Sequence, residues 1–142
     1  MDANERKFLQ GVKNVMDKTI SERVISCAFE VSNKLGAGFL EVVYENALCV
    51  ELERQKIRFE QQMPIDVVYR DSIVGFYVTD LLIEEKLLVE LKALTQLNRQ
   101  HDAQVMNYLK ATGMKVGLLL NFGTPKLGIR RIVWQYKETE RI

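Results

Sequence analysis

The stretch LLVELKA, residues 87–93, carries a glutamate and a lysine two positions apart inside an otherwise apolar segment. A short, almost continuous apolar run of this kind indicates a buried β-strand. In an extended strand, residues i and i+2 point to the same face, so Glu90 and Lys92 project together. An unpaired buried charge costs several kcal/mol, whereas strand propensities differ by only about 1 kcal/mol. The pair therefore needs a partner that neutralises it or a chemistry that uses it.

The segments around this stretch alternate between strand-like and helix-like patterns. We expect strands over residues 57–61, 64–69, 73–83, 87–91, 116–121 and 129–134. We expect helices over residues 5–17, 21–35, 39–56 and 99–112. Ser21 and Asn98 are the expected N-caps, and Gly36 and Gly113 the expected helix ends. This order predicts one α/β domain, in which a mixed β-sheet is flanked by helices.

Composition excludes several classes of protein. The chain of 142 residues has 20 basic and 19 acidic side chains, so a nucleic acid would have to be held by local contacts rather than by bulk positive charge. The single histidine, His101, rules out a zinc site built on several imidazoles. Cys27 and Cys49 form no CxxC pattern, and we find neither a signal peptide nor an apolar run of membrane-spanning length. We expect a cytoplasmic protein with reduced cysteines and no membrane partner.

The turn EEK, residues 84–86, sets the register of a predicted hairpin. If it forms a three-residue loop centred on Glu85, residues whose numbers sum to 170 oppose each other, and Asp80 lies opposite Glu90. Directly opposed residues have Cβ atoms about 4.5–5.5 Å apart. Two carboxylates so close repel unless one is protonated or a cation lies between them. Carboxylate oxygens completed by water are the ligands that Mg²⁺ or Mn²⁺ prefers.

Two interpretations of this acid–acid–base group remain open on spacing alone. One is a metal site. The other is a structural charge network at a sheet edge, in which Lys92 neutralises one carboxylate. A register shifted by one residue would move Asp80 to the other face and remove the metal interpretation.

Three motifs carry a resemblance to a known family. Asp80, Glu90, Leu91 and Lys92 give D-x9-E-L-K, which resembles the PD-(D/E)XK signature of metal-dependent nucleases. GFLEVVY, residues 38–44, matches the motif that names the GxxExxY family, which is assigned to that superfamily. QVMNY, residues 104–108, matches the QxxxY element of RecB-like nucleases. The resemblance runs from about residue 21 to 133 and implies a restriction-endonuclease-like core.

The resemblance also implies roles for individual residues. Asp80 and Glu90 would ligate Mg²⁺ or Mn²⁺, with the carbonyl of Leu91 as a further ligand and Glu41 as the helical acid that completes the site. Lys92 would orient or deprotonate the attacking water and help to stabilise the transition state. Without the resemblance, Glu41 reads as a first-turn acid favoured by the helix dipole.

The predicted helix over 99–112 would contribute the nucleic-acid contacts. His101, Gln104 and Tyr108 occupy positions i, i+3 and i+7 on one helical face. By resemblance, Gln104 and Tyr108 would contact nucleic acid or steady the site. We expect His101 to contact a phosphate or a residue that binds the metal, rather than to bind the metal itself. A polar stripe on a solvated helix is the alternative. Ser32 and Val78 depart from the family pattern, since members often have histidine at the first position and a basic residue at the second.

The resemblance thus implies a divalent-metal-dependent nuclease that hydrolyses phosphodiester bonds in DNA, with RNA as the alternative to DNA. A catalytically silent nucleic-acid-binding or protein-interaction module on the same fold is the first alternative. A metal-free hydrolase using two carboxylates for acid–base catalysis is the second, and it leaves Lys92 and Gln104 without roles.

The chain divides into three expected parts: a helical extension over residues 1–20, a nuclease-like domain over 21–136 and a tail over 137–142. The helix expected in the extension has a short apolar stripe. That stripe either pairs two chains into a homodimer or packs on its own domain.

Overall fold

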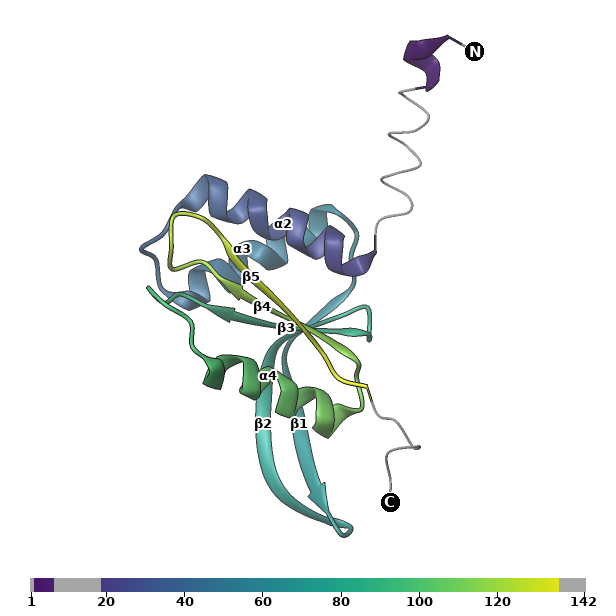
Figure 1. Ribbon diagram of the computed structural model, residues 1–142, viewed down its shortest axis with the longest axis vertical. Coiled ribbons are helices and arrows are strands. Elements are labelled where there is room, and N and C mark those ends of the chain that lie inside the picture. The colour runs from purple at the N-terminus through teal and green to yellow at the C-terminus, as the bar shows by residue number, and fades with distance from the viewer. Residues whose placement is uncertain (1, 7–18, 136–142) are drawn as a thin grey trace.

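The computed structural model describes residues 2–6 and 19–135, which contain a five-stranded sheet with helices on both faces (Figure 1). The helices are α2 (Ile20–Leu35), α3 (Glu41–Arg54) and α4 (Arg99–Thr112). The strands are β1 (Phe59–Tyr69), β2 (Ser72–Ile83), β3 (Leu87–Lys92), β4 (Val116–Asn121) and β5 (Gly128–Val133). Most of the predicted helix over 5–17 and the predicted tail over 137–142 lie outside the described residues.

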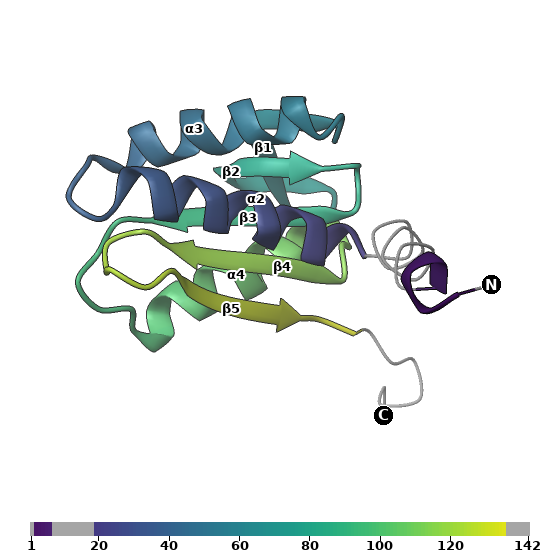
Figure 2. The ribbon, with the colours of Figure 1, turned by 90° about the horizontal axis from the view of Figure 1, so that it is seen from above.

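The strands lie side by side in the order β1-β2-β3-β4-β5 (Figure 2). Only β3 and β4 are parallel, and the other neighbours are antiparallel. A parallel pair needs a long crossover, which α4 provides. The predicted mixed sheet flanked by helices is confirmed.

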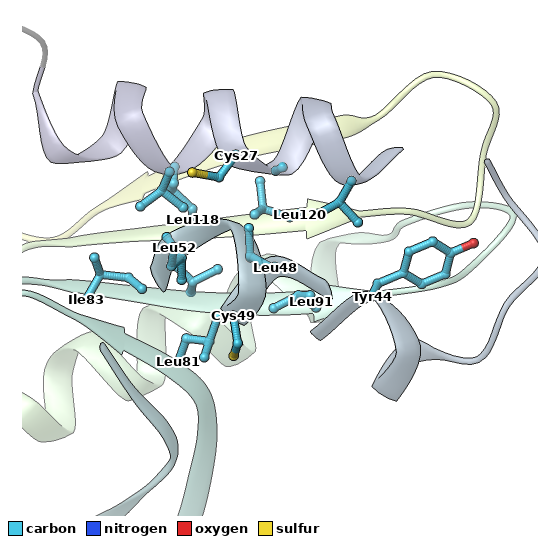
Figure 3. Close-up of a cluster of buried hydrophobic side chains, with 14 of the residues drawn as sticks. Cys27, Tyr44, Leu48, Cys49, Leu52, Leu81, Ile83, Leu91, Leu118 and Leu120 are labelled. Carbon is cyan, nitrogen blue, oxygen red and sulfur yellow. The ribbon is translucent and has the colours of Figure 1, made fainter. Parts of the chain in front are cut away.

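The central strands β3 and β4 are buried on both faces, which explains the continuous apolar run of β3. Leu87, Val89 and Leu91 belong to a core shared with α2 and α3, part of which Figure 3 shows. Leu88 belongs to a second core under α4. Glu90 is therefore a charged residue in the middle of a strand that is covered from both sides.

The predicted helix boundaries are accurate for α4 and agree within one residue for α2, which Gly36 ends as predicted. Asn98 caps α4 by accepting a backbone N–H of the first turn at 2.9 Å, and Gly113 ends it in the left-handed conformation. Thr19, not Ser21, caps α2, since the Thr19 hydroxyl accepts a first-turn N–H at 3.2 Å. Helix α3 is shorter than the predicted 39–56.

The two strands predicted over 57–61 and 64–69 form a single strand, β1. Pairing with β2 continues in the same register on both sides of Gln62, with Gln61 opposite Leu81 and Met63 opposite Thr79. The partner strand therefore keeps this segment extended although its sequence does not alternate. Gln62 adopts a left-handed φ of 57° within the strand, and this irregularity bears on the site described below.

Strand β2 leaves the sheet part-way along its length. It pairs with β3 over three residue pairs, from Ile83 with Leu87 to Leu81 with Val89, each summing to 170 as predicted. Beyond Leu81 it pairs only with β1. The resulting β1–β2 hairpin projects past α4 in Figure 1.

We predict that Gly117→Ala destabilises the fold, because β4 passes close beneath α4 at this residue. An added Cβ would lie 2.6 Å from Cγ1 of Val105, a stiff β-branched side chain in the helix. Overpacking of this kind costs about 1–3 kcal/mol, measurable as a lower free energy of unfolding in urea. Gly75→Ala is the matched control, since its Cβ would meet only ordinary contacts at 3.6 Å or more. Equal stability of the two variants would contradict the prediction.

Candidate metal centre

Two carboxylates occupy the place where β2 separates from β3. The separation leaves backbone N–H groups without ladder partners, and buried N–H groups require acceptors. Oε1 of Glu90 accepts the N–H of Asp80 at 2.9 Å, and Oδ2 of Asp80 accepts the N–H of Leu91 at 2.8 Å. Thr79, which is fully buried, also donates its hydroxyl to Oε1 of Glu90 at 3.0 Å. Each acid is thus fixed by the backbone of the opposite strand.

This arrangement places the negative charge of the carboxylates in a buried region of the protein. Glu90 is only 5% exposed, and burial together with the nearby Asp80 carboxylate raises its pKa to about 7. Hydrogen bonds from Asp80 and Thr79 and the charge of Lys92 oppose this rise without cancelling it. A cation held between the carboxylates would relieve the same repulsion.

Lys92 is held beside the acids by the end of β4. Its carbonyl accepts the N–H of Phe122 at 2.8 Å. The buried Asn121 amide bonds both backbone groups of Leu94, at 3.0 and 2.9 Å, which fastens the loop that follows Lys92. Gly123 passes so close to Leu94 that an added Cβ would collide with its backbone. These contacts hold the backbone at the end of β3, where Lys92 lies.

The residues of the GxxExxY-like motif hold Glu41 at the start of α3. Gly38 has a φ of 118°, which disfavours other residues. The buried Tyr44 hydroxyl donates to the carbonyl of Gly36 at 2.6 Å and accepts the N–H of Phe39 at 3.1 Å, so it ties the turn to the helix. Partial burial and the Asp80 carboxylate raise the pKa of Glu41, whereas the charge of Lys92 lowers it. Glu41 is thus electrostatically part of the same group.

A further acid, Glu45, belongs to this site and was not predicted from the sequence. It is 5% exposed, and the side-chain amides of Gln61 and Gln62 donate to its two oxygens at 2.6 and 2.8 Å. Gln62 also donates to Oδ1 of Asp80 at 3.3 Å. Burial is the main cause that raises the pKa of Glu45, and the negative charge of Asp80 raises it further. The hydrogen bond from Gln61 lowers it.

The conformation of Gln62 accounts for this contact. Consecutive residues of a regular strand point to opposite faces, yet Gln61 and Gln62 both reach Glu45. The left-handed φ of Gln62 interrupts the alternation. Such strained residues gather at functional sites. The available sequence signal was the spacing of Glu45, four residues after Glu41 and hence on the same helical face.

Helix α4 places Tyr108 near the acids, and Gln104 forms a hydrogen bond with Tyr108. Burial and the Glu90 charge raise the pKa of Tyr108, which is 5% exposed, and its hydroxyl accepts a bond from the Gln104 amide at 3.0 Å. His101 is used differently. Its Nδ1 accepts the N–H of Asn98 at 3.0 Å in a capping box, so only Nε2 is available for a phosphate.

The donor set fits a magnesium-type ion that keeps water or substrate ligands. Among the described residues, no three acidic, histidine or cysteine side chains are arranged to hold an ion by themselves. Mg²⁺ commonly takes one or two protein carboxylates and fills its shell with water and phosphate oxygens. The hydrogen bonds that Glu90 accepts from Thr79 and Asp80 both end on Oε1. The N–H of Leu91 faces Asp80, and its carbonyl points to the same strand edge.

The two departures from the family pattern lie in different surroundings. Ser32 is buried in α2, and Val78 is 38% exposed on β2, two residues before Asp80. Neither contributes a carboxylate to the group of acids.

Comparison with known proteins identifies the family. Residues 18–132, most of the chain, match the model of the PD-(D/E)XK nuclease superfamily, so the chain belongs to that superfamily and has its restriction-endonuclease-like α/β fold. These proteins are mostly nucleases that depend on divalent metals. No curated protein matches the sequence. The solved structure titled "Crystal structure of SSO0001" is 12% identical, with a TM-score of 0.48 over 98% of this chain and 81% of that chain.

A separate finding concerns membranes. No helix within the described residues is both long and apolar enough to cross a bilayer.

We predict that Glu90→Gln stabilises the metal-free protein at pH 8. The folded-state pKa of Glu90, about 7, lies above the ordinary glutamate pKa of 4.5, so its favourable contribution to stability is complete below pH 4.5 and is lost as pH rises through 7. Glutamine keeps an acceptor for Thr79 and Asp80 without the charge. Urea unfolding in EDTA should show a gain of up to roughly 3 kcal/mol at pH 8 and a much smaller one at pH 5.

Glu60→Gln, an exposed position on β1, serves as the control. A Glu90→Gln variant that is less stable than the wild type at pH 8 would show that the ionised carboxylate stabilises the fold.

Proposed function

We propose that the protein is a Mg²⁺- or Mn²⁺-dependent nuclease that hydrolyses phosphodiester bonds in DNA. The observation that carries the proposal is the pair of hydrogen bonds at the separation of β2 and β3, in which Glu90 accepts the N–H of Asp80 and Asp80 accepts the N–H of Leu91. The charge of Lys92 acts on the same group. Membership of the superfamily supports a metal-dependent nuclease. The choice of DNA over RNA rests on the sequence resemblance.

In this proposal, Asp80, Glu90 and the carbonyl of Leu91 hold the ion, and Glu41 completes the site. Glu45 positions Asp80 through Gln62, which bonds both acids. When bound, the ion lowers the pKa of a water molecule and stabilises charge on the phosphoryl oxygen.

Lys92 acts on the attacking water. Its ammonium orients the water toward phosphorus and then balances the negative charge that develops there. The oxygen of the water forms a bond to phosphorus as the bond from phosphorus to the leaving oxygen breaks. The water gives up a proton to solvent, and the leaving oxygen takes up a proton from solvent. Gln104 and Tyr108 contact the nucleic acid, and His101 contacts a phosphate through Nε2.

The remaining assignments extend the proposal. We assign the chain to the GxxExxY family, because Gly38, Glu41 and Tyr44 have the distinct structural roles described above. We take residues 21–136 as the nuclease domain, following the range of the motifs. Free, buried Cys27 and Cys49 suit a reducing cytoplasm. A homodimer through residues 1–20 stays part of the proposal.

We predict that purified protein cuts DNA with Mg²⁺ or Mn²⁺ and not with EDTA. Single-stranded, duplex and branched substrates should be compared on denaturing gels. Glu90→Ala should abolish cutting because it removes a ligand, and Lys92→Ala should slow it by about 100-fold or more because it removes the group that orients the water. Glu45→Gln should weaken Mn²⁺ binding measured by calorimetry, since it alters the support of Asp80.

Glu85→Ala and Lys86→Ala, in the exposed hairpin turn, are the matched controls and should cut like the wild type. Nucleic-acid binding without cutting under every condition would favour the catalytically silent module. Cutting that survives EDTA would favour the metal-free hydrolase.

A further inference from the structure

A pocket lies between the β1–β2 hairpin and α4, next to the proposed metal site. Its volume is about 470 Å³, and its lining includes Val67, Val68, Tyr77, Asn107, Tyr108 and Lys110. The rings of Tyr77 and Tyr108 meet with centroids 5.6 Å apart at 47°. Tyr108 belongs both to the candidate metal centre and to this pocket. Its hydroxyl accepts a hydrogen bond from Gln104, and the Glu90 charge raises its pKa. The same residue lines the pocket.

The pocket presents one aromatic ring that the protein leaves partly uncovered. Tyr77 is 51% exposed, whereas Tyr108 is 5% exposed and serves as the floor. Burying an aromatic ring is strongly favourable, so a half-exposed tyrosine beside an apolar wall offers a stacking surface. Val67 and Val68 supply that wall from the neighbouring strand.

Two polar side chains at the pocket have no protein partner. Within the described part of the chain, the amide of Asn107 forms no hydrogen bond and the ammonium of Lys110 forms no ion pair. An amide carries both donors and an acceptor, as the polar edge of a nucleobase does. A lysine on the next turn of the helix is suited to a phosphate oxygen.

We infer that this pocket binds an unpaired nucleobase of the strand whose phosphodiester enters the metal site. Tyr77 stacks on the base, Asn107 bonds its polar edge and Lys110 contacts a phosphate. The inference rests on the proposed function, and it specifies the substrate class: a single strand, an overhang or an extruded nucleotide rather than a fully stacked duplex.

The position of Tyr77 agrees with this assignment. It precedes Asp80 by three residues on β2, so the two lie about 10 Å apart along an extended strand. That separation is within reach of a nucleotide near the bond that is cut. A base in a duplex is covered by its neighbours, whereas an unpaired base exposes its face and its polar edge.

The net charge of the protein also favours an unpaired base over a duplex as the ligand of this pocket. With a formal net charge of only +1, the chain lacks the excess of cations by which many proteins bind duplex phosphates. Base–aromatic stacking contributes about 1–3 kcal/mol per base and does not depend on counterion release. A protein of this composition gains more from one stacked base than from its few local cations.

The test measures binding in EDTA, where metal-dependent cutting is absent. The probe is a 12-nucleotide single strand with a central 2-aminopurine, whose fluorescence is quenched by stacking, prepared as DNA and as RNA beside a duplex of the same sequence. We expect the single strand to bind more tightly than the duplex. Tyr77→Ala should weaken single-strand binding by about fivefold to 150-fold and remove the quenching.

Three further variants separate stacking from folding. Tyr77→Phe keeps the ring and should bind within about threefold of the wild type. Phe76→Ala removes the adjacent ring, 63% exposed on the opposite face of β2, and should not change binding. Lys110→Ala should lower the slope of log affinity against log salt by about 0.7, whereas Tyr77→Ala should leave that slope unchanged.

The outcomes for the pocket and for the nuclease are separate. Wild-type binding that depends on Tyr77 without cutting in Mg²⁺ or Mn²⁺ upholds the pocket and rejects the nuclease. Cutting of single strands by Tyr77→Ala with unchanged affinity and quenching upholds the nuclease and overturns the pocket. Equal losses in Tyr77→Ala and Phe76→Ala, or equal affinity for duplex and single strand, also overturn it. Dependence on Tyr77 with DNA alone, with RNA alone or with both supports the pocket and identifies the strand.

Discussion

The candidate site depends on one constraint: two backbone N–H groups lose their ladder partners where β2 separates from β3. Each is satisfied by a carboxylate of the opposite strand, Asp80 for Leu91 and Glu90 for Asp80. The acids therefore serve as structural acceptors, and their oxygens are held in place by the fold. A site built on such bonds is organised before any ligand arrives.

The same arrangement explains why the site costs stability. Glu90 is covered on both sides of a central strand and lies close to another acid, which is why its pKa rises to about 7. A neutral side chain would suit the fold better at neutral pH. Retaining an acid there is reasonable if the charge is used, because natural proteins accept local strain where function requires it. The alternative interpretation, a structural charge network in which Lys92 neutralises one carboxylate, would not require Asp80 and Glu90 to be held so close together.

Much of this organisation could be predicted from local sequence. The turn at 84–86 fixed the register that brings Asp80 to Glu90, and it did so because a hairpin loop leaves little freedom in pairing. Asn98 and Gly113 marked the ends of α4 because capping is a local interaction. The apolar run of β3 predicted a strand buried on both faces.

The parts that were missed depend on contacts distant in sequence. Glu45 shares its helical face with the buried Leu48 and Cys49. Its polar partners, the amides of Gln61 and Gln62, lie on β1, which is distant in sequence from that helix. β1 is continuous because β2 pairs with it on both sides of Gln62, not because its own residues alternate. Asn121 clamps the loop after Lys92 across 27 residues of chain. The fold adds these supports to acids that the sequence already displays, and the left-handed Gln62 is where β1 departs from regular geometry to reach them.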